Sequence, residues 1–241
     1  MSRIEHIGDA TLYLGDCLDI LPTLGNVDAL VWDPPWGIGF KEYADYDDDP
    51  ECYPEWLNAA LASSECLVRD GWCVVFQGPR RAFEWARLVP REYRVMACAK
   101  NFRQILPGKG PLWSTDFALF WSQGTPRVEH GKGRDFHLAI TSDMRDRPKG
   151  HPCPRPLDQM VHVVNCFTEA AHVVLDPTMG SGTTGVACAK LGRKFIGIEI
   201  HEPYFDIACR RIEEAYRQPR LFAEPRPKAT QDNLFAHGGA S

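Results

Sequence analysis

The sequence lacks the features that would place the chain in a membrane, in a secretory pathway or around a structural metal. No apolar run approaches the length that crosses a bilayer. The N-terminal stretch MSRIEHIGDATLYLGD carries polar and charged residues where a signal peptide needs an apolar core. The nine cysteines are scattered, without a C-x-x-C pair or a Cys/His cluster at zinc spacing. We therefore expect a cytoplasmic protein with reduced cysteines, no membrane association and no bound metal.

The size and composition of the chain indicate one folded domain followed by a tail. With 241 residues, of which 44% are hydrophobic and 24% charged, the chain can form one sizeable core, and a second full domain is not expected. No internal repeat is present. From residue 217 onward, Pro, Gly, Ala and charged residues predominate. We predict a single domain over residues 1–216 and a flexible tail over 217–241.

The charges are distributed unevenly along the chain. The formal net charge is −5, yet segment 77–155 holds fifteen Lys and Arg against seven Asp and Glu. One basic surface on an acidic body is typical of a protein that contacts phosphates. A solvated surface with a chance bias would look the same, so the charge pattern alone does not decide between the two.

Alternating strands and helices predict an α/β fold with a doubly wound, mostly parallel sheet. Near-continuous apolar runs predict strands buried on both faces. The predicted strands are 11–14, 27–32, 72–76, 116–121, 172–175 and 195–200. The predicted helices are 17–24, 53–67, 80–88, 157–168, 183–191 and 203–216. Segments 100–110 and 124–156 show little periodicity and are expected to be loops. Ligands of such sheets bind beyond the carboxyl ends of strands.

A glycine-rich turn joins a strand to a helix within segment 172–200. Gly180 and Gly182 lack a Cβ, so a ligand can approach the backbone closely. Thr183 and Thr184 open the following helix, whose free N–H groups favour an anionic group such as a carboxylate. The turn predicts a ligand site, although a bare G-x-G is more often only a tight turn.

The strand after this helix ends in Glu199, an acid placed to accept hydrogen bonds from ribose hydroxyls. Together with Asp176 at the end of the preceding strand, it makes the unit more specific than the glycines alone. The sequence lacks both G-x-x-x-x-G-K-[ST] and the full G-x-G-x-x-G spacing. A site for nucleotide phosphates is therefore not expected.

The tetrapeptide Asp33-Pro34-Pro35-Trp36 follows a predicted buried strand. A carboxylate and a neighbouring carbonyl can accept both N–H groups of a planar amine, which frees its delocalised lone pair for attack. The prolines stiffen the turn and limit the entropy lost in holding that geometry. Trp36 offers a flat surface on which an extruded base can stack. The alternative is a proline-rich turn that Asp33 caps.

These motifs resemble those of the amino-methyltransferases that use S-adenosylmethionine (SAM). Segment 176–184, DPTMGSGTT, is similar to their DP-F-x-GSGTT signature, with Met179 in place of Phe. His151 and Arg155 lie in HPCPRP, which resembles the HPxxKP element near the methionine end of the cofactor. Arg155 replaces the usual Lys, which keeps the charge and changes the donor geometry.

Segment 15–18, GDCL, resembles the element whose Asp contacts the adenine of the cofactor, although Asp16 also suits a helix N-cap. The cofactor-binding residues that the resemblance implies, together with those argued above, are Asp16, Cys17, Asp33, His151, Arg155, Asp176, Thr178, Gly180, Gly182, Thr183, Thr184 and Glu199. The implied catalytic residues are Asp33, Pro34, Pro35 and Trp36.

DPPW resembles the catalytic motif of enzymes that methylate adenine N6, cytosine N4 or other planar amides. It precedes the cofactor turn, as in the permuted β-type DNA methyltransferases. The resemblance implies a Rossmann-like fold with circularly permuted motif order, SAM as cofactor and double-stranded DNA as substrate. Asp33 favours adenine N6, because cytosine enzymes commonly have Ser there. Cytosine N4 methylation, RNA adenine methylation and a catalytically silent DNA-binding module stay as alternatives.

Two regions depart from this pattern. Only residues 102–150 are available for target recognition, which predicts a short or relaxed target site, or recognition shared by a homodimer. The acidic loop 45–49 is expected to point away from the duplex. In the tail, Q-x-x-L-F occurs at 218–222 and at Gln231–Phe235, and is similar to the peptide that docks on bacterial sliding clamps. Alternatively, the first copy packs on the last helix and the second is coincidental.

Overall fold

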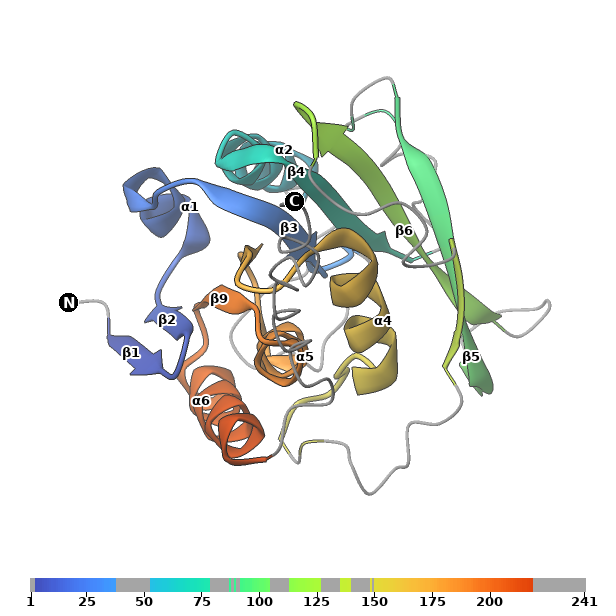
Figure 1. Ribbon diagram of the computed structural model, residues 1–241. Helices are drawn as coiled ribbons and strands as arrows, with labels where there is room; N and C mark the ends of the chain where they lie inside the picture. Colours follow the sequence, from blue (N-terminus) through green and yellow to red (C-terminus); the bar gives the residue numbers. More distant parts are fainter. Residues whose placement is uncertain are drawn as a thin grey trace, which may run out of the picture.

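The computed structural model describes residues 3–37, 53–78, 87, 89, 92–104, 113–126, 135–139, 148 and 150–218. Within these residues, nine strands form one sheet in the order β1-β2-β9-β8-β3-β4-β6-β5-β7 (Figure 1). The strands are β1 (Ile4–Ile7), β2 (Ala10–Leu14), β3 (Val27–Trp32), β4 (Val68–Gln77), β5 (Arg94–Gln104), β6 (Trp113–Gln123), β7 (Phe136–Ala139), β8 (Val173–Asp176) and β9 (Lys194–Glu199). The helices are α1 (Cys17–Ile20), the 3₁₀ turn η1 (Leu21–Thr23), α2 (Tyr53–Glu65), α4 (Leu157–Phe167), α5 (Thr183–Leu191) and α6 (Glu202–Arg217).

The centre of the sheet is parallel. Strands β2, β9, β8, β3 and β4 are neighbours in this order, and each pairs with the next in parallel. Their carboxyl ends therefore meet at one edge. At the flanks, β1 pairs antiparallel with β2, and β6 pairs antiparallel with both β4 and β5. The expected mostly parallel α/β sheet is confirmed.

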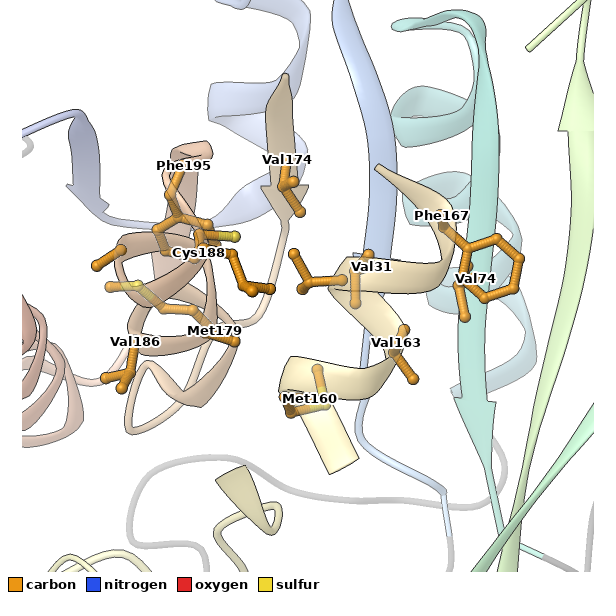
Figure 2. Packing of buried hydrophobic residues seen from close by; sticks show 14 of the residues in the cluster. Val31, Val74, Met160, Val163, Phe167, Val174, Met179, Val186, Cys188 and Phe195 are labelled. Atoms are coloured by element: carbon orange, nitrogen blue, oxygen red, sulfur yellow. The ribbon is translucent and has the colours of Figure 1, made fainter. Parts of the chain in front are cut away.

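Helices cover both faces of the sheet, because successive side chains of a strand point to opposite sides. In β3, Val31 belongs to the core under α4, α5 and α6, whereas Leu30 and Trp32 belong to the core under α1 and α2. Figure 2 shows Met160 and Val163 of α4 beside Val31. All five side chains are fully buried. Burial of a large apolar side chain stabilises the fold by about 1.5–3 kcal/mol, so these contacts fix β3 between its two layers of helices.

The sequence-based boundaries agree with the structure in the buried core and differ from it at the flanks. Strand 27–32 and helix 183–191 have the predicted bounds. The expectation of loops at 100–110 and 124–156 was wrong in part, since β5 continues to Gln104 and β7 occupies Phe136–Ala139. These strands lie at the end of the sheet, where one-sided burial leaves no continuous apolar run.

Several predictions lie outside the described residues. They are the helix at 80–88, the acidic loop 45–49, most of the proposed recognition segment 102–150, and the tail after Gln218 with its second Q-x-x-L-F copy.

Gly182 is required for packing between helices. It caps the N-terminus of α5 with a φ of 74°, in the left-handed region that favours glycine. A Cβ added there would lie 2.8 Å from the Cβ of Ala208 in α6. Close approach of α6 is thus a reason for this glycine that the sequence did not show, while close approach of a ligand stays a prediction.

We predict that Gly182→Ala lowers the free energy of unfolding by about 1–3 kcal/mol, because a non-glycine residue is strained at this φ and its methyl group overlaps α6. Urea denaturation would measure the loss. Gly25→Ala is the matched control, since a Cβ at Gly25 meets no atom within 4 Å. Equal stability of the two variants would contradict the packing role of Gly182.

Candidate active site

The four predicted catalytic residues follow β3 directly, at the edge where the parallel strands end. Because β3 lies between β8 and β4, this turn is flanked by the glycine-rich turn after β8 and by the end of β4. Pro34 is buried, while the side chain of Asp33 keeps 25% of its surface exposed. The carboxylate can therefore be reached from outside while its backbone is held in the core.

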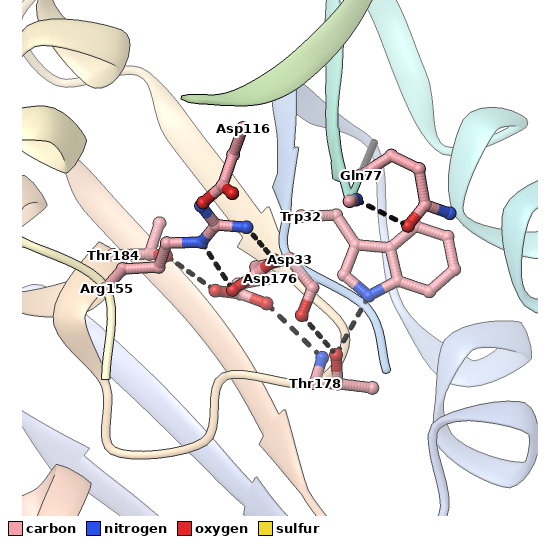
Figure 3. Close-up of polar contacts among 9 residues, drawn as sticks. Trp32, Asp33, Gln77, Asp116, Arg155, Asp176, Thr178 and Thr184 are labelled. Atoms are coloured by element: carbon pink, nitrogen blue, oxygen red, sulfur yellow. Dashed lines mark hydrogen bonds and ion pairs between the residues drawn. The ribbon is translucent and has the colours of Figure 1, made fainter. Parts of the chain in front are cut away.

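A hydrogen-bonded link joins the turn after β3, which carries Asp33, to the glycine-rich turn after β8. Trp32 Nε1 donates to Thr178 Oγ1 at 2.9 Å, and the same hydroxyl lies 3.4 Å from the carbonyl oxygen of Asp33 (Figure 3). A buried indole N–H normally has an acceptor. Sequence reasoning treated Trp32 only as the end of a strand. The signal for its second role, linking the two turns, was its indole N–H, which needs an acceptor when it is buried.

Arg155 holds the carboxylate of Asp33 with two parallel hydrogen bonds. Its Nε donates to one oxygen at 2.7 Å and its Nη2 to the other at 2.6 Å (Figure 3). Its guanidinium also lies over the rings of Phe76, at 4.4 Å, and Trp36, at 5.4 Å. Only an arginine offers this planar fork, so the replacement of Lys by Arg changes what the residue contacts. In the structure it contacts the carboxylate of Asp33.

Asp116 completes this group and was missed by sequence reasoning. It lies in β6, is 3% exposed and accepts a hydrogen bond from Arg155 Nη1 at 2.6 Å. Burial disfavours the charged guanidinium, but Asp33 and Asp116 outweigh this and raise the pKa of Arg155 above its ordinary range. The signal in the sequence was an acid next to the apolar run FALFW, since a buried carboxylate needs a partner.

The two predicted acids of the cofactor unit shape the glycine-rich turn. Asp176 accepts from Thr184 Oγ1 at 2.6 Å and from the N–H of Thr178 at 3.3 Å. The two oxygens of Glu199 accept from the N–H groups of Gly180 and His201, each at 2.8 Å. Both acids therefore fix backbone geometry in the structure. Binding of ribose hydroxyls by Glu199 stays a prediction.

His151 lies against the first glycine of the turn. Gly180 has a φ of 52°, and a Cβ there would meet His151 Nε2 at 2.8 Å. The His151 ring packs edge-on against Tyr204 of α6, with centroids 4.6 Å apart. Burial, above all, lowers the pKa of His151 to about 4, so its imidazole is neutral near pH 7. The HPCPRP segment thus contributes a neutral donor or acceptor to this turn.

Arg211 of α6 adds a cation beside the same turn. Its Nη1 donates to the carbonyl oxygen of Ser181 and lies 3.0 Å from Ser181 Oγ and 3.1 Å from Thr183 Oγ1. Burial lowers the pKa of Arg211 to about 10, which leaves it charged at neutral pH. No motif in the sequence pointed to this residue, because its contact depends on how α6 packs.

Asp16 and Cys17 were predicted to contact a cofactor through the segment GDCL. Asp16 caps α1, since its carboxylate accepts from the N–H of Leu18 at 2.8 Å. The N–H of Gly15 donates to the carbonyl of Glu199 at 2.9 Å, which places this turn beside the end of β9. The thiol of Cys17 is in the hydrophobic core, and burial raises its pKa to about 12. The thiol of Cys17 thus serves packing, and the cofactor contacts of Asp16 and Cys17 stay predictions.

Among the described residues there is no candidate metal site and no helix that could span a membrane. Among them, no three His, Cys, Asp or Glu side chains are grouped so that they could hold a metal ion. No helix in this part of the chain combines the length and the apolar character needed to cross a bilayer.

Comparisons with known proteins agree with this architecture. A family described as DNA methylase (N6_N4_Mtase) matches residues 113–210. YubD of Escherichia coli (strain K12), considered to be a methylase, is 28% identical over 218 residues, which cover 84% of this chain and 90% of that protein. The crystal structure of the M1.HpyAVI–SAM complex superposes with a TM-score of 0.67 and 27% identity, covering 84% of this chain and 98% of that chain. The cytosine-N4-specific PvuII DNA methyltransferase has the same fold, with a TM-score of 0.71 at 16% identity over 88% of this chain and 92% of that chain.

We predict that stability falls as the pH rises towards neutrality. Burial raises the pKa values of Asp176 and Glu199 to about 7, whereas in the unfolded chain such acids ionise near pH ~4. Between these values the folded protein keeps protons that the unfolded chain has released. Each acid therefore lowers the free energy of unfolding by up to about 1.4 kcal/mol per pH unit in this window.

Asp176→Asn removes one of these titrations and should make the decline shallower. Urea denaturation at intervals between about pH 5 and about pH 8 measures it. Asp19→Asn, at an exposed position of α1, is the control and should keep the slope of the parent. Parallel profiles of Asp176→Asn and parent would show that Asp176 ionises normally in the folded protein.

Proposed function

We propose that this chain, which belongs to the family of N6-adenine and N4-cytosine DNA methylases, transfers a methyl group from SAM to N6 of adenine in double-stranded DNA. One observation carries the proposal. Asp33 presents a partly exposed carboxylate at the strand edge where the glycine-rich turn lies, and Thr178 touches both turns. The amine acceptor and the cofactor turn thus belong to one site.

The residues of the glycine-rich turn fit SAM. Gly180 leaves room that a Cβ would fill, and Nδ1 of His151, which is buried beside it, has no hydrogen-bond partner among the residues that the structure describes. The N-terminus of α5, with Arg211 beside it, would hold the carboxylate of SAM. A neutral His151 does not repel the cationic sulfur. When bound, SAM supplies an electrophilic methyl group on a sulfonium.

Asp33 and Pro34 prepare the target amine for attack. In an adenine the N6 lone pair is delocalised into the ring, so the amine is a poor nucleophile. Asp33 accepts one N–H and the carbonyl oxygen of Pro34 accepts the other. These two bonds draw the nitrogen towards tetrahedral geometry and free its lone pair. The nitrogen is acidic once methylated, so no residue with a raised basicity is needed to remove its proton.

Two more residues hold the reactants in place. Trp36 offers a ring on which the extruded base can stack, and its own ring is packed against Gly78. Arg155 fixes the plane of the Asp33 carboxylate, which limits the entropy lost when the amine binds. The Asp33 oxygens keep further lone-pair directions for the substrate, because an ionised carboxylate has about four acceptor sites.

Adenine is favoured over cytosine by the aspartate that begins the DPPW motif. Cytosine N4 methylation is the second candidate, since it uses the same geometry and the fold is shared with an enzyme of that specificity. RNA methylation and a silent DNA-binding module rank lower. A silent module has no physical need for the partly exposed carboxylate of Asp33.

The direct test incubates the protein with methyl-labelled SAM and either unmethylated bacterial DNA or bacterial RNA, then separates the nucleosides after digestion. Label in N6-methyladenine supports the proposal. Label in N4-methylcytosine keeps the mechanism and rejects adenine as the substrate, and label in RNA alone would move the substrate to RNA. Binding of SAM without label in any nucleic acid would favour the silent module.

We predict that Asp33→Asn lowers the methylation rate by roughly 10²- to 10⁴-fold, because the amide keeps one acceptor oxygen and loses the charge. Binding of SAM, measured by calorimetry, should change little, since Asp33 is assigned to the target amine. Asp19→Asn serves as the control and should leave both quantities unchanged. A comparable loss of SAM affinity in Asp33→Asn would assign Asp33 to the cofactor instead.

A further inference from the structure

We propose that Asp116 is a positioning residue for the catalytic carboxylate and acts through Arg155. This inference rests on the proposed function, because it concerns the same carboxylate of Asp33. It adds a residue that lies outside every motif in the sequence, on a strand at the far side of β4.

The side chains of Asp33, Arg155 and Asp116 form a chain of alternating charges. Arg155 uses three of its five N–H groups, two on Asp33 and one on Asp116, at distances of 2.6–2.7 Å. The side chain of Arg155 is 8% exposed, and its guanidinium also lies over the rings of Phe76 and Trp36. A guanidinium that is hydrogen-bonded to a carboxylate at each end has a fixed orientation, and it passes that orientation to Asp33 (Figure 3).

The two acids differ in what they can reach. Asp33 is 25% exposed, whereas Asp116 is 4% exposed at its side chain. Asp33 can therefore meet a substrate amine, and Asp116 is enclosed behind Arg155. Because Asp116 is linked to Asp33 through the guanidinium, it is a positioning residue.

Charge gives Asp116 a second effect on the same carboxylate. Hydrogen bonds to ionised groups are strong, and two carboxylates share the one guanidinium of Arg155. Without the charge of Asp116, Arg155 would be drawn to Asp33 alone. The oxygens of Asp33 would then be weaker acceptors for the amine of the base. Asp116 therefore keeps Asp33 both aligned and available.

The fold explains why Asp116 is in place. Strand β6 runs antiparallel to β4, with Phe117 opposite Gln77. The start of β6 thus meets the end of β4, beside the catalytic turn. A change at Asp116 leaves the residues of both turns unaltered.

The first test compares Asp116→Asn with the parent. The amide keeps the shape and one acceptor but loses the charge. We expect kcat to fall about ten- to hundredfold, as expected for a misplaced reactive group, with KM for DNA and SAM affinity unchanged. Asp19→Asn, which removes an exposed acid of α1, should keep the parental kcat. Asp116→Glu keeps the charge and should retain more activity than Asp116→Asn; equal loss in the two variants would overturn the role of charge.

A double-mutant cycle with Arg155→Lys separates positioning from packing. The ammonium of lysine cannot form the fork on Asp33 and also reach Asp116, so the path between the acids is broken. In that background Asp116→Asn should change kcat by less than about twofold, because coupled residues are not additive. The same fold loss in both backgrounds would mean that Asp116 acts independently of Arg155 and would overturn the proposal.

A spectroscopic readout keeps this test separate from the proposed function. In the parent labelled with ¹⁵N-arginine, the Nε–H and Nη–H signals of Arg155 should exchange slowly with water, because the group is clamped. They are assigned by their loss in Arg155→Lys. Asp116→Asn should speed the Nη–H exchange, and unchanged exchange would overturn the positioning role. If the parent methylates no nucleic acid, the proposed function fails, while this spectrum still decides whether Asp116 holds Arg155.

Discussion

The parallel pairing of β3 with β8 is the constraint on which the site depends. Ala29 and Leu30 align with Val174 and Leu175, residues about 145 positions further along the chain. This register puts the turn after β3 beside the turn after β8, so Asp33 and Thr178 come within hydrogen-bond reach. The hydrogen bond from the Trp32 indole to Thr178 holds the two turns together as well. Each turn alone is only a strand ending, and their alignment makes one site.

Buried charge shapes the site and opposes the stability of the fold. Asp176 is buried at a strand edge where its hydrogen bonds hold a turn, and its raised pKa shows that the folded state disfavours its ionised form. Burial has the same effect on Glu199. In contrast, Arg155 stays charged because Asp33 and Asp116 surround it. Sites that bind charged ligands need such preorganised groups, and the apolar cores on both faces of the sheet offset what these groups cost in stability.

The last helix contributes to the glycine-rich turn as much as the turn's own sequence does. Ala208 of α6 explains why Gly182 has no Cβ, Tyr204 supports the ring of His151, and Arg211 holds Ser181. None of the three α6 residues belongs to a motif recognised in the sequence. These contacts arise because α6 follows β9 and returns along the face of the sheet where α5 lies. The two helices are neighbours (Figure 1). The glycine-rich turn is thus supported by a helix surface that carries no signature of its own.

The sequence by itself determined the alternating α/β pattern, the buried strand 27–32, the helix 183–191 and the two turns that carry Asp33 and Gly180. Local patterns encode these features, because apolar runs, glycines and prolines act over a few residues. Only the tertiary structure decided that Arg155 pairs with Asp33, that Asp116 completes the pair, and that Gly182 and Cys17 serve packing. Those contacts join strands and helices far apart in the chain. Their partners are chosen by strand order and register, which no local pattern contains.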